Sequence, residues 1–125
     1  MSRILLIDDC RTIYLKLRQV FEDTPYALER LKLLVDLPKI LRLTPPDLVL
    51  LDLQMPSLDG ERVGEFIRSF EPSPTRIVIY SGGDLAEMER VADRVGAAAL
   101  ISKDAADGEV LSVIRHVLGR PPVHR

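Results

Sequence analysis

The sequence has a single cysteine, no large excess of charge of either sign and no long apolar run. One cysteine cannot form a disulfide within the chain, which favours a reducing, cytoplasmic compartment. With 17 Lys and Arg against 19 Asp and Glu, the net charge is −2, so no overall positive field attracts nucleic acid or an anionic membrane. The first apolar run, residues 4–7, is too short for a signal peptide or a membrane span. The length of 125 residues then predicts one small soluble domain.

Repeats, low-complexity tracts and dinucleotide-binding glycines are also missing. No period recurs along the chain, which excludes a solenoid, and no biased tract predicts extensive disorder. Gly-x-Gly-x-x-Gly does not follow the first apolar run, which argues against a dinucleotide enzyme. What recurs instead is a short apolar run followed by a longer segment with helical spacing.

Four apolar runs contain no charged residue, which is typical of strands buried on both faces of a parallel sheet. A fifth candidate, residues 26–33, is weaker because Leu28 and Leu31 are its main support. The four clear strands are predicted at residues 4–7, 48–51, 77–80 and 98–101.

Between the strands, apolar residues repeat with the spacing of one helix face, and we expect these faces to form the core. Asp36, Asp84 and Asp107 are placed to cap three of the helices, and Gly96 and Gly119 to end two of them. Phe66 and Leu85 belong to these predicted core faces. The predicted helices lie at about residues 13–21, 37–43, 63–70, 85–95 and 110–118.

The alternation of strands and helices predicts a doubly wound α/β domain, with a five-stranded parallel sheet and helices on both faces. Right-handed crossovers bring the carboxyl ends of the strands to one edge, where ligands bind in such folds. We expect the domain to span residues 1–119, followed by a short flexible tail at 120–125 and by no output domain.

Polar side chains follow four of the predicted strands at that edge. Asp8 and Asp9 end the first strand, Asp52 the third, Ser81 the fourth and Lys103 the fifth. Carboxylates this close repel one another, so the cluster predicts a cation, and Mg²⁺ suits a site of few carboxylates and water. Each residue alone has a plainer interpretation: a helix cap, a turn, a loop hydroxyl or a surface charge. Their joint placement favours a functional site.

These residues, with the segment that follows Asp52, resemble the receiver domain of two-component response regulators, in particular the stand-alone chemotaxis type. The similarity spans about residues 3–118. The resemblance implies a flavodoxin-like fold with strand order 2-1-3-4-5. The matching residues are Ile-Asp-Asp at 7–9, Asp-Leu-Gln-Met-Pro-Ser-Leu-Asp-Gly at 52–60, Ser81 and Lys103. Within residues 52–60, the resemblance implies that Met-Pro and Asp-Gly shape the loop after Asp52 and begin the next helix.

The resemblance further implies a phosphorylation site. Asp52 would accept a phosphoryl group from a phosphohistidine of a histidine kinase or phosphotransfer protein. Asp9, Asp52 and the backbone carbonyl of Gln54 would bind Mg²⁺, with Asp8 acting largely through water. No enzymatic activity is implied beyond the domain's own phosphorylation and dephosphorylation. The side chains that would contact the phosphoryl oxygens are Lys103 and Ser81.

The implied switch is centred on Ser81. Phosphorylation would add about −1.5 to −2 of charge at Asp52. Ser81 would then move inward with Gly82 and Gly83, which lower the energy needed to rearrange the loop. The movement would reach the face of the fourth helix, fifth strand and fifth helix, where a downstream protein would bind. The implied molecule is a monomer or weak dimer that contacts neither nucleic acid nor a membrane directly.

Two positions depart from the family pattern. Leu100 stands three residues before Lys103, where receivers commonly carry an aromatic residue that couples to the switch hydroxyl. Tyr80 is the nearest aromatic residue, at a different strand position. Asp104 replaces the usual proline after the lysine and places a second carboxylate where it can compete for Lys103. The phosphotransfer residues are complete, so these changes bear on the coupling to the output face.

Two other functions stay open. The changes at positions 100 and 104 fit a receiver-like adaptor that binds partner proteins without phosphorylation. A phosphatase with an aspartyl nucleophile also uses a strand-end Asp and Mg²⁺, but such enzymes have Asp-x-Asp where this chain has Asp8-Asp9-Cys10. Cys10 itself is expected to be a small, half-buried residue, with redox sensing as the alternative.

Overall fold

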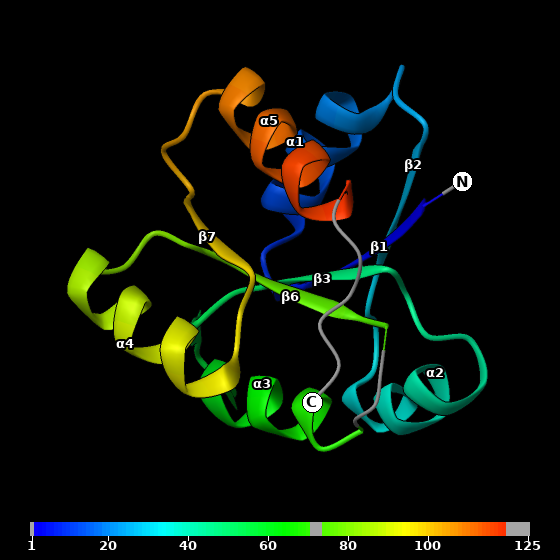
Figure 1. Ribbon diagram of the computed structural model, residues 1–125, viewed down its shortest axis with the longest axis vertical. Helices are drawn as coiled ribbons and strands as arrows, with labels where there is room; N and C mark the ends of the chain where they lie inside the picture. Colours follow the sequence, from blue (N-terminus) through cyan, green and yellow to red (C-terminus); the bar gives the residue numbers. More distant parts are fainter. Residues whose placement is uncertain (1, 71–73, 120–125) are drawn as a thin grey trace.

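A computed structural model describes residues 2–70 and 74–119, so the tail expected at 120–125 lies outside the described residues. Five strands form one parallel sheet in the order β2-β1-β3-β6-β7 (Figure 1). This order confirms the predicted 2-1-3-4-5 arrangement, because the sheet's fourth and fifth strands along the chain are β6 and β7. The strands are β1 Ser2–Ile7, β2 Tyr26–Arg30, β3 Leu48–Leu51, β6 Arg76–Ser81 and β7 Ala99–Ser102.

Helices cover both faces of this sheet. In Figure 1, α1 and α5 lie on one face, and α2, α3 and α4 lie on the other. Within the described ranges, none of the helices combines the length and apolar character needed to cross a membrane. The helices are α1 Arg11–Phe21, α2 Leu37–Leu43, α3 Gly60–Arg68, α4 Leu85–Val95 and α5 Asp107–Leu118, and a 3₁₀ turn, η1 Leu34–Asp36, precedes α2.

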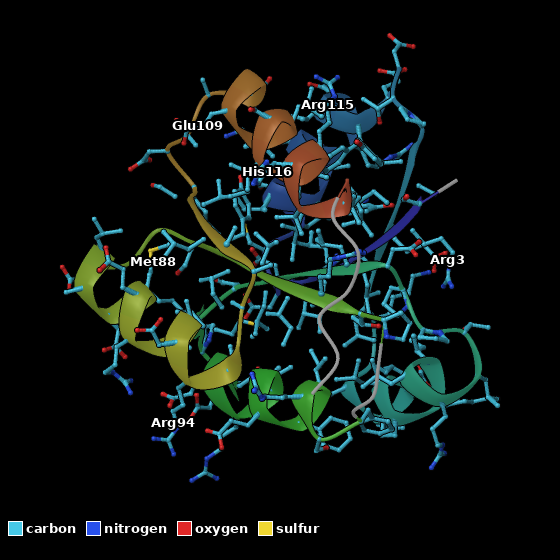
Figure 2. The ribbon with its side chains drawn as sticks, in the orientation of Figure 1. Arg3, Met88, Arg94, Glu109, Arg115 and His116 are labelled. Atoms are coloured by element: carbon cyan, nitrogen blue, oxygen red, sulfur yellow. The ribbon has the colours of Figure 1, made fainter. Side chains whose placement is uncertain are left out.

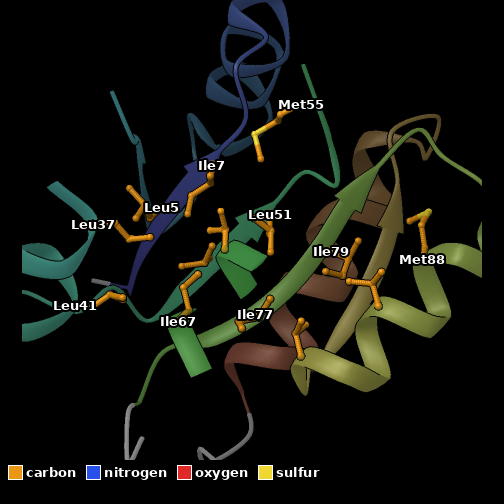
Figure 3. Close-up of a cluster of buried hydrophobic side chains, with 14 residues drawn as sticks. Leu5, Ile7, Leu37, Leu41, Leu51, Met55, Ile67, Ile77, Ile79 and Met88 are labelled. Carbon is orange, nitrogen blue, oxygen red and sulfur yellow. The ribbon is translucent and has the colours of Figure 1, made fainter. Parts of the chain in front are cut away.

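The core consists of two clusters separated by the sheet. Side chains alternate between the faces of each strand, so Leu5 and Ile7 of β1 pack under α2–α4, whereas Ile4 and Leu6 pack under α1 and α5. Figure 3 shows the first cluster, with Leu5, Ile7, Leu51 and Ile79 along the sheet and Met88 on α4. Because both faces are covered, the four-residue strand β3 is fully buried, which explains its uninterrupted apolar sequence.

One of the three predicted aspartate caps is confirmed. Asp84 precedes α4 in an extended conformation, and its carboxylate accepts a hydrogen bond from the Glu87 N–H at 3.2 Å. Asp36 is not a side-chain cap: it ends η1 with helical backbone angles, and its side chain makes no cap hydrogen bond to α2. Asp107 is also not the cap: it is the first residue of α5, and Ala106 occupies the cap position. Gly96 ends α4 with a φ of 69°, a left-handed conformation that favours glycine.

Three predictions of burial are wrong. Leu85 is 57% exposed at the first turn of α4, because the stripe that it begins turns toward the sheet only at Met88. Phe66 is 38% exposed and packs edge-to-face against Phe70, with ring centroids 5.1 Å apart, instead of entering the core. Cys10 is exposed, because it lies in the loop between β1 and α1.

The sequence also failed to predict a two-stranded antiparallel hairpin that directly follows β3. Its strands, β4 Gln54–Met55 and β5 Leu58–Asp59, are two residues long, too short to give a periodic pattern. The hairpin brings the chain from the end of β3 into the first turn of α3, and so it lies beside the carboxyl edge of the sheet.

Candidate functional site

Three aspartates meet at the carboxyl ends of β1 and β3. The two strands are neighbours in the sheet, and the Asp52 N–H donates a hydrogen bond to the carbonyl of Ile7 at 3.0 Å. Asp8 and Asp52 are buried, whereas Asp9 is exposed. Each of the three offers a carboxylate oxygen within 4.8 Å of those of the other two. The predicted convergence of these side chains is therefore confirmed.

Local hydrogen bonds fix the two buried carboxylates. Asp8 Oδ1 accepts from the Cys10 N–H at 2.9 Å, and Asp52 Oδ1 accepts from the Gln54 N–H at 3.1 Å. Both bonds join a strand-end aspartate to a residue two places on, so each carboxylate stabilises the turn that leaves its strand. The helix-cap interpretation of Asp8-Asp9 is not supported, because Cys10 occupies the cap position of α1 and no side chain caps that helix.

Lys103 supplies positive charge to this acidic cluster. Its ammonium Nζ lies 2.8 Å from Asp8 Oδ2 and 3.3 Å from Asp52 Oδ2. Burial lowers the pKa of Lys103, but the hydrogen bond and charge of Asp8 and the charge of Asp52 outweigh it, so the pKa is raised. Asp104 forms no ion pair with Lys103, contrary to the expected competition; its own N–H bonds to Ser102 Oγ at 3.1 Å.

Ser81 is fully buried at the end of β6, the strand between β3 and β7. Its backbone carbonyl accepts from the Lys103 N–H at 3.0 Å, which ties the end of β6 to the residue that follows β7. Its hydroxyl Oγ accepts from the Gly83 N–H at 3.4 Å. Ser81 is therefore held between the strands that carry Asp52 and Lys103, with its hydroxyl engaged in the loop that leads to α4.

The segment after Asp52 folds back against that residue. Asp59 caps α3 by accepting from the N–H groups of Glu61 and Arg62, at 3.0 and 3.4 Å. A Cβ at Gly60 would lie 2.3 Å from the backbone oxygen of Asp52, so only glycine allows α3 to begin this close to the strand end. Met55 is buried in the hairpin. The expected structural role of Met-Pro and Asp-Gly is consistent with these contacts.

Gln54 and Gly83 are in contact, which no sequence pattern indicates. A Cβ at Gly83 would lie 2.9 Å from Gln54 Nε2, so the amide side chain packs directly over the glycine backbone. Gln54 comes from the hairpin after β3 and Gly83 from the loop after β6. Because neither residue has a charge or an apolar periodicity, no sequence pattern could have paired them.

Leu100 and Tyr80 lie on opposite faces of the sheet. Leu100 is partly buried against the cluster under α2–α4, whereas Tyr80 is fully buried in the cluster under α1 and α5. Residue 100 pairs with Ile79, the neighbour of Tyr80 along β6. Since successive side chains alternate between faces, the phenol of Tyr80 cannot occupy the position that the resemblance assigns to an aromatic residue.

The donor set fits a hard divalent cation. Three carboxylates face one ammonium group in the cluster, which leaves an excess of negative charge for a cation to offset. All the offered donors are oxygen atoms, which is the preference of Mg²⁺. Asp8, Asp9 and Asp52 would hold the ion. The Gln54 N–H donates a 3.1 Å hydrogen bond to Asp52 Oδ1, which keeps the backbone of Gln54 beside this carboxylate.

Comparisons with known proteins agree with this arrangement. Residues 4–115 match the response regulator receiver domain, so the chain belongs to that family. The chain is 36% identical over 69 residues to the probable transcriptional regulatory protein NarL of Mycobacterium tuberculosis (strain CDC 1551 / Oshkosh), covering 55% of this chain and 32% of NarL. The matched segment thus spans about a third of the length of that curated relative.

A relative of matching length and a solved structure are also similar. Protein CcdB of Bacillus subtilis (strain 168) is 28% identical over 123 residues, which cover 95% of this chain and 99% of CcdB. The crystal structure of a CheY-like response regulator receiver domain protein from Methanospirillum hungatei JF-1 has a TM-score of 0.83 and 23% identity, covering 95% of this chain and 94% of that one. This structural likeness shows the same fold. As a receiver domain, the chain is a signalling domain of two-component systems.

Proposed function

We propose that Asp52 accepts a phosphoryl group and that the resulting charge changes which proteins this receiver domain binds. The observation that carries the proposal is the convergence of Asp8, Asp9 and Lys103 on the Asp52 carboxylate. The donor is a phosphohistidine on a histidine kinase or a phosphotransfer protein, as receiver domain membership implies.

In the transfer, an Asp52 carboxylate oxygen attacks the phosphorus atom. A new O–P bond forms as the P–N bond to the donor histidine breaks, and the bonding electrons return to the imidazole. Asp52 Oδ1 is engaged by the Gln54 N–H, and Oδ2 faces Lys103 at 3.3 Å. We assign Oδ2 as the nucleophile, because its partner is a side chain that can follow the incoming phosphoryl oxygens.

Two groups on neighbouring strands would stabilise the phosphorylated form. Lys103 would exchange its contact with Asp52 for one with a phosphoryl oxygen and keep its 2.8 Å contact with Asp8. The Ser81 hydroxyl would donate a hydrogen bond to another phosphoryl oxygen. Mg²⁺ bound by Asp8, Asp9, Asp52 and the Gln54 carbonyl would supply positive charge that offsets repulsion between carboxylate and phosphodonor.

The switch would begin with the loss of the contact between Ser81 and Gly83. The Gly83 N–H donates to Ser81 Oγ at 3.4 Å, a long hydrogen bond that inward movement of Ser81 would break. Gly82 has no atom within contact distance of an added Cβ except Lys103 Cδ at 4.0 Å, so the loop has room to move there. Gly83 would also change its packing against Gln54. Movement of this loop shifts the start of α4, because Asp84 caps that helix.

The second half of α4 is tied to α3 by ion pairs. Arg90 Nη2 lies 3.0 Å from Glu61 Oε1, and Arg94 Nε lies 3.0 Å from Glu61 Oε2 and 3.3 Å from Glu65 Oε1. Figure 2 shows Arg94 on the outer side of α4, next to α3. These contacts favour a switch confined to the Ser81–Asp84 loop, the first turn of α4 and Leu100 on β7. We propose the face formed by α4, β7 and α5 as the surface that binds a downstream protein.

Acetyl phosphate provides the test. The purified protein is incubated with this donor and Mg²⁺ and its intact mass is measured. Addition of one phosphoryl group to the wild type and to the control Asp93→Asn, and none to Asp52→Asn, is the expected result. Asp93 is an exposed aspartate on α4, so its substitution makes the same change of charge away from the site. No addition to the wild type, or equal addition to Asp52→Asn, would overturn the proposal.

A phosphorylation-independent adaptor is the second candidate, and the position of Leu100 favours it. No aromatic side chain stands at position 100, and Tyr80 lies on the other face of the sheet. A partner that binds wild type and Asp52→Asn with equal affinity, in the presence of an active kinase, would favour the adaptor. A higher affinity for the wild type under those conditions would favour the phosphorylation switch.

Three further expectations stay predictions: a stand-alone protein, a cytoplasmic location and a monomer or weak dimer. Relatives of this family include both a protein of matching length and a longer regulator, of which the matched segment covers 32%. Sedimentation of the protein purified from its own cells, before and after phosphorylation, measures both the size of the chain's assembly and its dependence on the phosphoryl group.

A further inference from the structure

A basic pocket lies between α1 and the end of β2, on the side of the domain away from the α4–β7–α5 face. Its volume is about 320 Å³. Two residues give it an apolar floor: the half-buried Tyr14 and Leu15, which is 44% exposed. Its remaining lining consists of cationic side chains: Arg11, Arg18, Arg30 and Lys32.

The four cations have no ion-pair partner among residues 2–70 and 74–119. The concentration of charge is local, because the whole chain has a net charge of −2. Helix α1 has three basic residues and no acidic one. Arg11 at its first position opposes the helix dipole, so stability of α1 does not explain the arginine there. An arrangement that disfavours the helix but concentrates positive charge is typical of a binding site.

Arg30 adds an unsatisfied donor. Its Nη2 donates to the carbonyl of Asp9 at 3.3 Å, which fixes the guanidinium beside the loop that follows β1. Its Nε–H is buried and has no acceptor within the described part of the chain. A buried donor without a partner is costly, and an oxygen acceptor that reached it would relieve that cost.

The aromatic floor holds one of the other guanidinium groups in place. The Arg18 guanidinium carbon lies 5.9 Å from the centre of the Tyr14 ring, within the range of a cation–π contact. This contact restrains Arg18 without using its N–H donors. Planar guanidinium groups with free donors match the oxygen atoms of phosphate groups, which they bind in a bidentate manner.

We propose that this pocket binds a small organic phosphate of nucleotide size. The phosphate oxygens would accept from Arg18, Arg30 and Lys32, and the organic part would pack on Leu15 and the edge of Tyr14. A volume of about 320 Å³ is at the lower end of the range for small-molecule sites and exceeds what one carboxylate side chain needs. A concave site of this size therefore favours a small ligand over the convex acidic surface of a partner protein.

The inference does not rest on phosphorylation of Asp52. None of the pocket residues belongs to the acidic cluster, although Arg30 contacts the backbone of Asp9. Binding can therefore be measured in EDTA, where divalent cations are absent from the acidic cluster. Asp52→Asn should bind the ligand as the wild type does, so failure of the phosphotransfer proposal and failure of this one are distinguishable.

Calorimetric titration in EDTA with ATP, AMP, pyrophosphate and adenosine tests the proposal. We expect ATP and AMP to bind, adenosine not to bind, and pyrophosphate to bind more weakly than ATP. Arg18→Gln and Lys32→Gln should each weaken ATP binding roughly tenfold, the loss expected for one charged hydrogen bond. Arg42→Gln is the matched control, because Arg42 is an exposed arginine on α2 outside the pocket and its substitution makes the same change of charge.

Three outcomes would overturn the inference. One is no binding of ATP or AMP to the wild type. Another is equal weakening by Arg42→Gln and Arg18→Gln, which indicates a general charge effect. The third is binding of an acidic peptide such as a glutamate decamer in place of the nucleotides, which indicates a protein partner. Tyr14→Leu keeps an apolar floor but removes the ring under Arg18, and we expect it to weaken ATP without unfolding the domain.

Discussion

Lys103 Nζ and Asp8 Oδ2 lie 2.8 Å apart, which makes this the shortest ion pair in the acidic cluster. The Asp8 side chain is fully buried, while that of Lys103 is 20% exposed. The lysine is thus the ionic partner of a carboxylate that has no access to water. Within the described cluster it balances part of the charge of three aspartates.

Removal of the lysine charge should destabilise the domain unless Mg²⁺ is present. Lys103→Met leaves Asp8 buried without its ion pair, and we expect the free energy of unfolding to fall by about 3 kcal/mol in EDTA. A divalent cation bound by the aspartates would restore most of this loss. Urea unfolding with EDTA or Mg²⁺ measures the difference, and Lys39→Met, at an exposed position on α2, is the control. If Mg²⁺ stabilises neither Lys103→Met nor the wild type, the aspartates do not hold the cation; equal stabilisation of the two would show that the cation does not replace the lysine charge.

The close approach between α3 and Asp52 makes a second prediction. Gly60→Ala places a methyl group 2.3 Å from the Asp52 backbone oxygen and 2.8 Å from Leu53 Cα, so the helix start must shift. We expect a loss of stability of about 1–3 kcal/mol, as for an overpacked site, together with slower phosphorylation by acetyl phosphate.

The matched control for that substitution is Gly108→Ala. An added Cβ at Gly108 would meet no atom within 4 Å, and the residue lies in the first turn of α5. Alanine is the better helix former, so this variant should be unchanged or more stable by up to about 1 kcal/mol. Equal stability of the two variants in urea would show that the contact with Asp52 is not constraining.

The sheet and the acidic cluster could be predicted because their causes are local in the sequence. Uninterrupted apolar runs such as residues 48–51 identify strands that are covered on both faces, and a parallel sheet brings the ends of such strands to one edge. Once the strands were placed, the positions of Asp52 and Lys103 followed from the topology.

Features that depend on the direction of the chain at an element's end could not be predicted. Asp36 and Asp84 are both aspartates that directly precede a helix. Only Asp84 approaches its helix in an extended conformation. Apolar periodicity does not show at which residue the apolar face of a helix first reaches the sheet, so the prediction that Leu85 lies in the core is wrong. The contact of Gln54 with Gly83 joins two loops whose paths depend on the packed strands.

The difference between true and apparent caps is measurable. Asp59→Ala removes a carboxylate that accepts two N–H bonds at the start of α3, and it should lower the free energy of unfolding by about 1 kcal/mol. Asp36→Ala removes a carboxylate that makes no cap bond and should change it by much less. Urea unfolding of both variants at the same pH tests this. A larger loss for Asp36→Ala would mean that Asp36 stabilises α2 by another route.

Tyr80 is fully buried, and its hydroxyl has no hydrogen-bond partner among the described residues, which costs stability. Tyr80→Phe keeps the ring and removes the unsatisfied oxygen. We expect the variant to be more stable than the wild type by about 1 kcal/mol or more at neutral pH. The free energy of unfolding in urea measures the gain. A loss of stability would indicate that the hydroxyl is bonded to a water molecule within the domain.

The same phenol makes the stability of the domain depend on high pH. Burial, and to a smaller extent the charges of Asp8 and Asp107, raise the pKa of Tyr80, although Lys103 acts in the opposite direction. In the unfolded chain its pKa is about 10, so above that pH the unfolded chain loses its proton first and the free energy of unfolding falls.

Lys103 adds a contribution with the same sign. Its folded pKa is raised, so its stabilisation is fully present below the unfolded pKa of about 10.4 and is lost as the pH rises through the folded value. Tyr80→Phe removes only the tyrosine part, and the decline in its stability between about pH 9 and 11 should be shallower than in the wild type but not absent. Urea unfolding across this range measures both slopes, and parallel slopes would contradict a raised Tyr80 pKa. Tyr26→Phe, at a partly buried position on β2, is the matched control for the loss of a phenol hydroxyl.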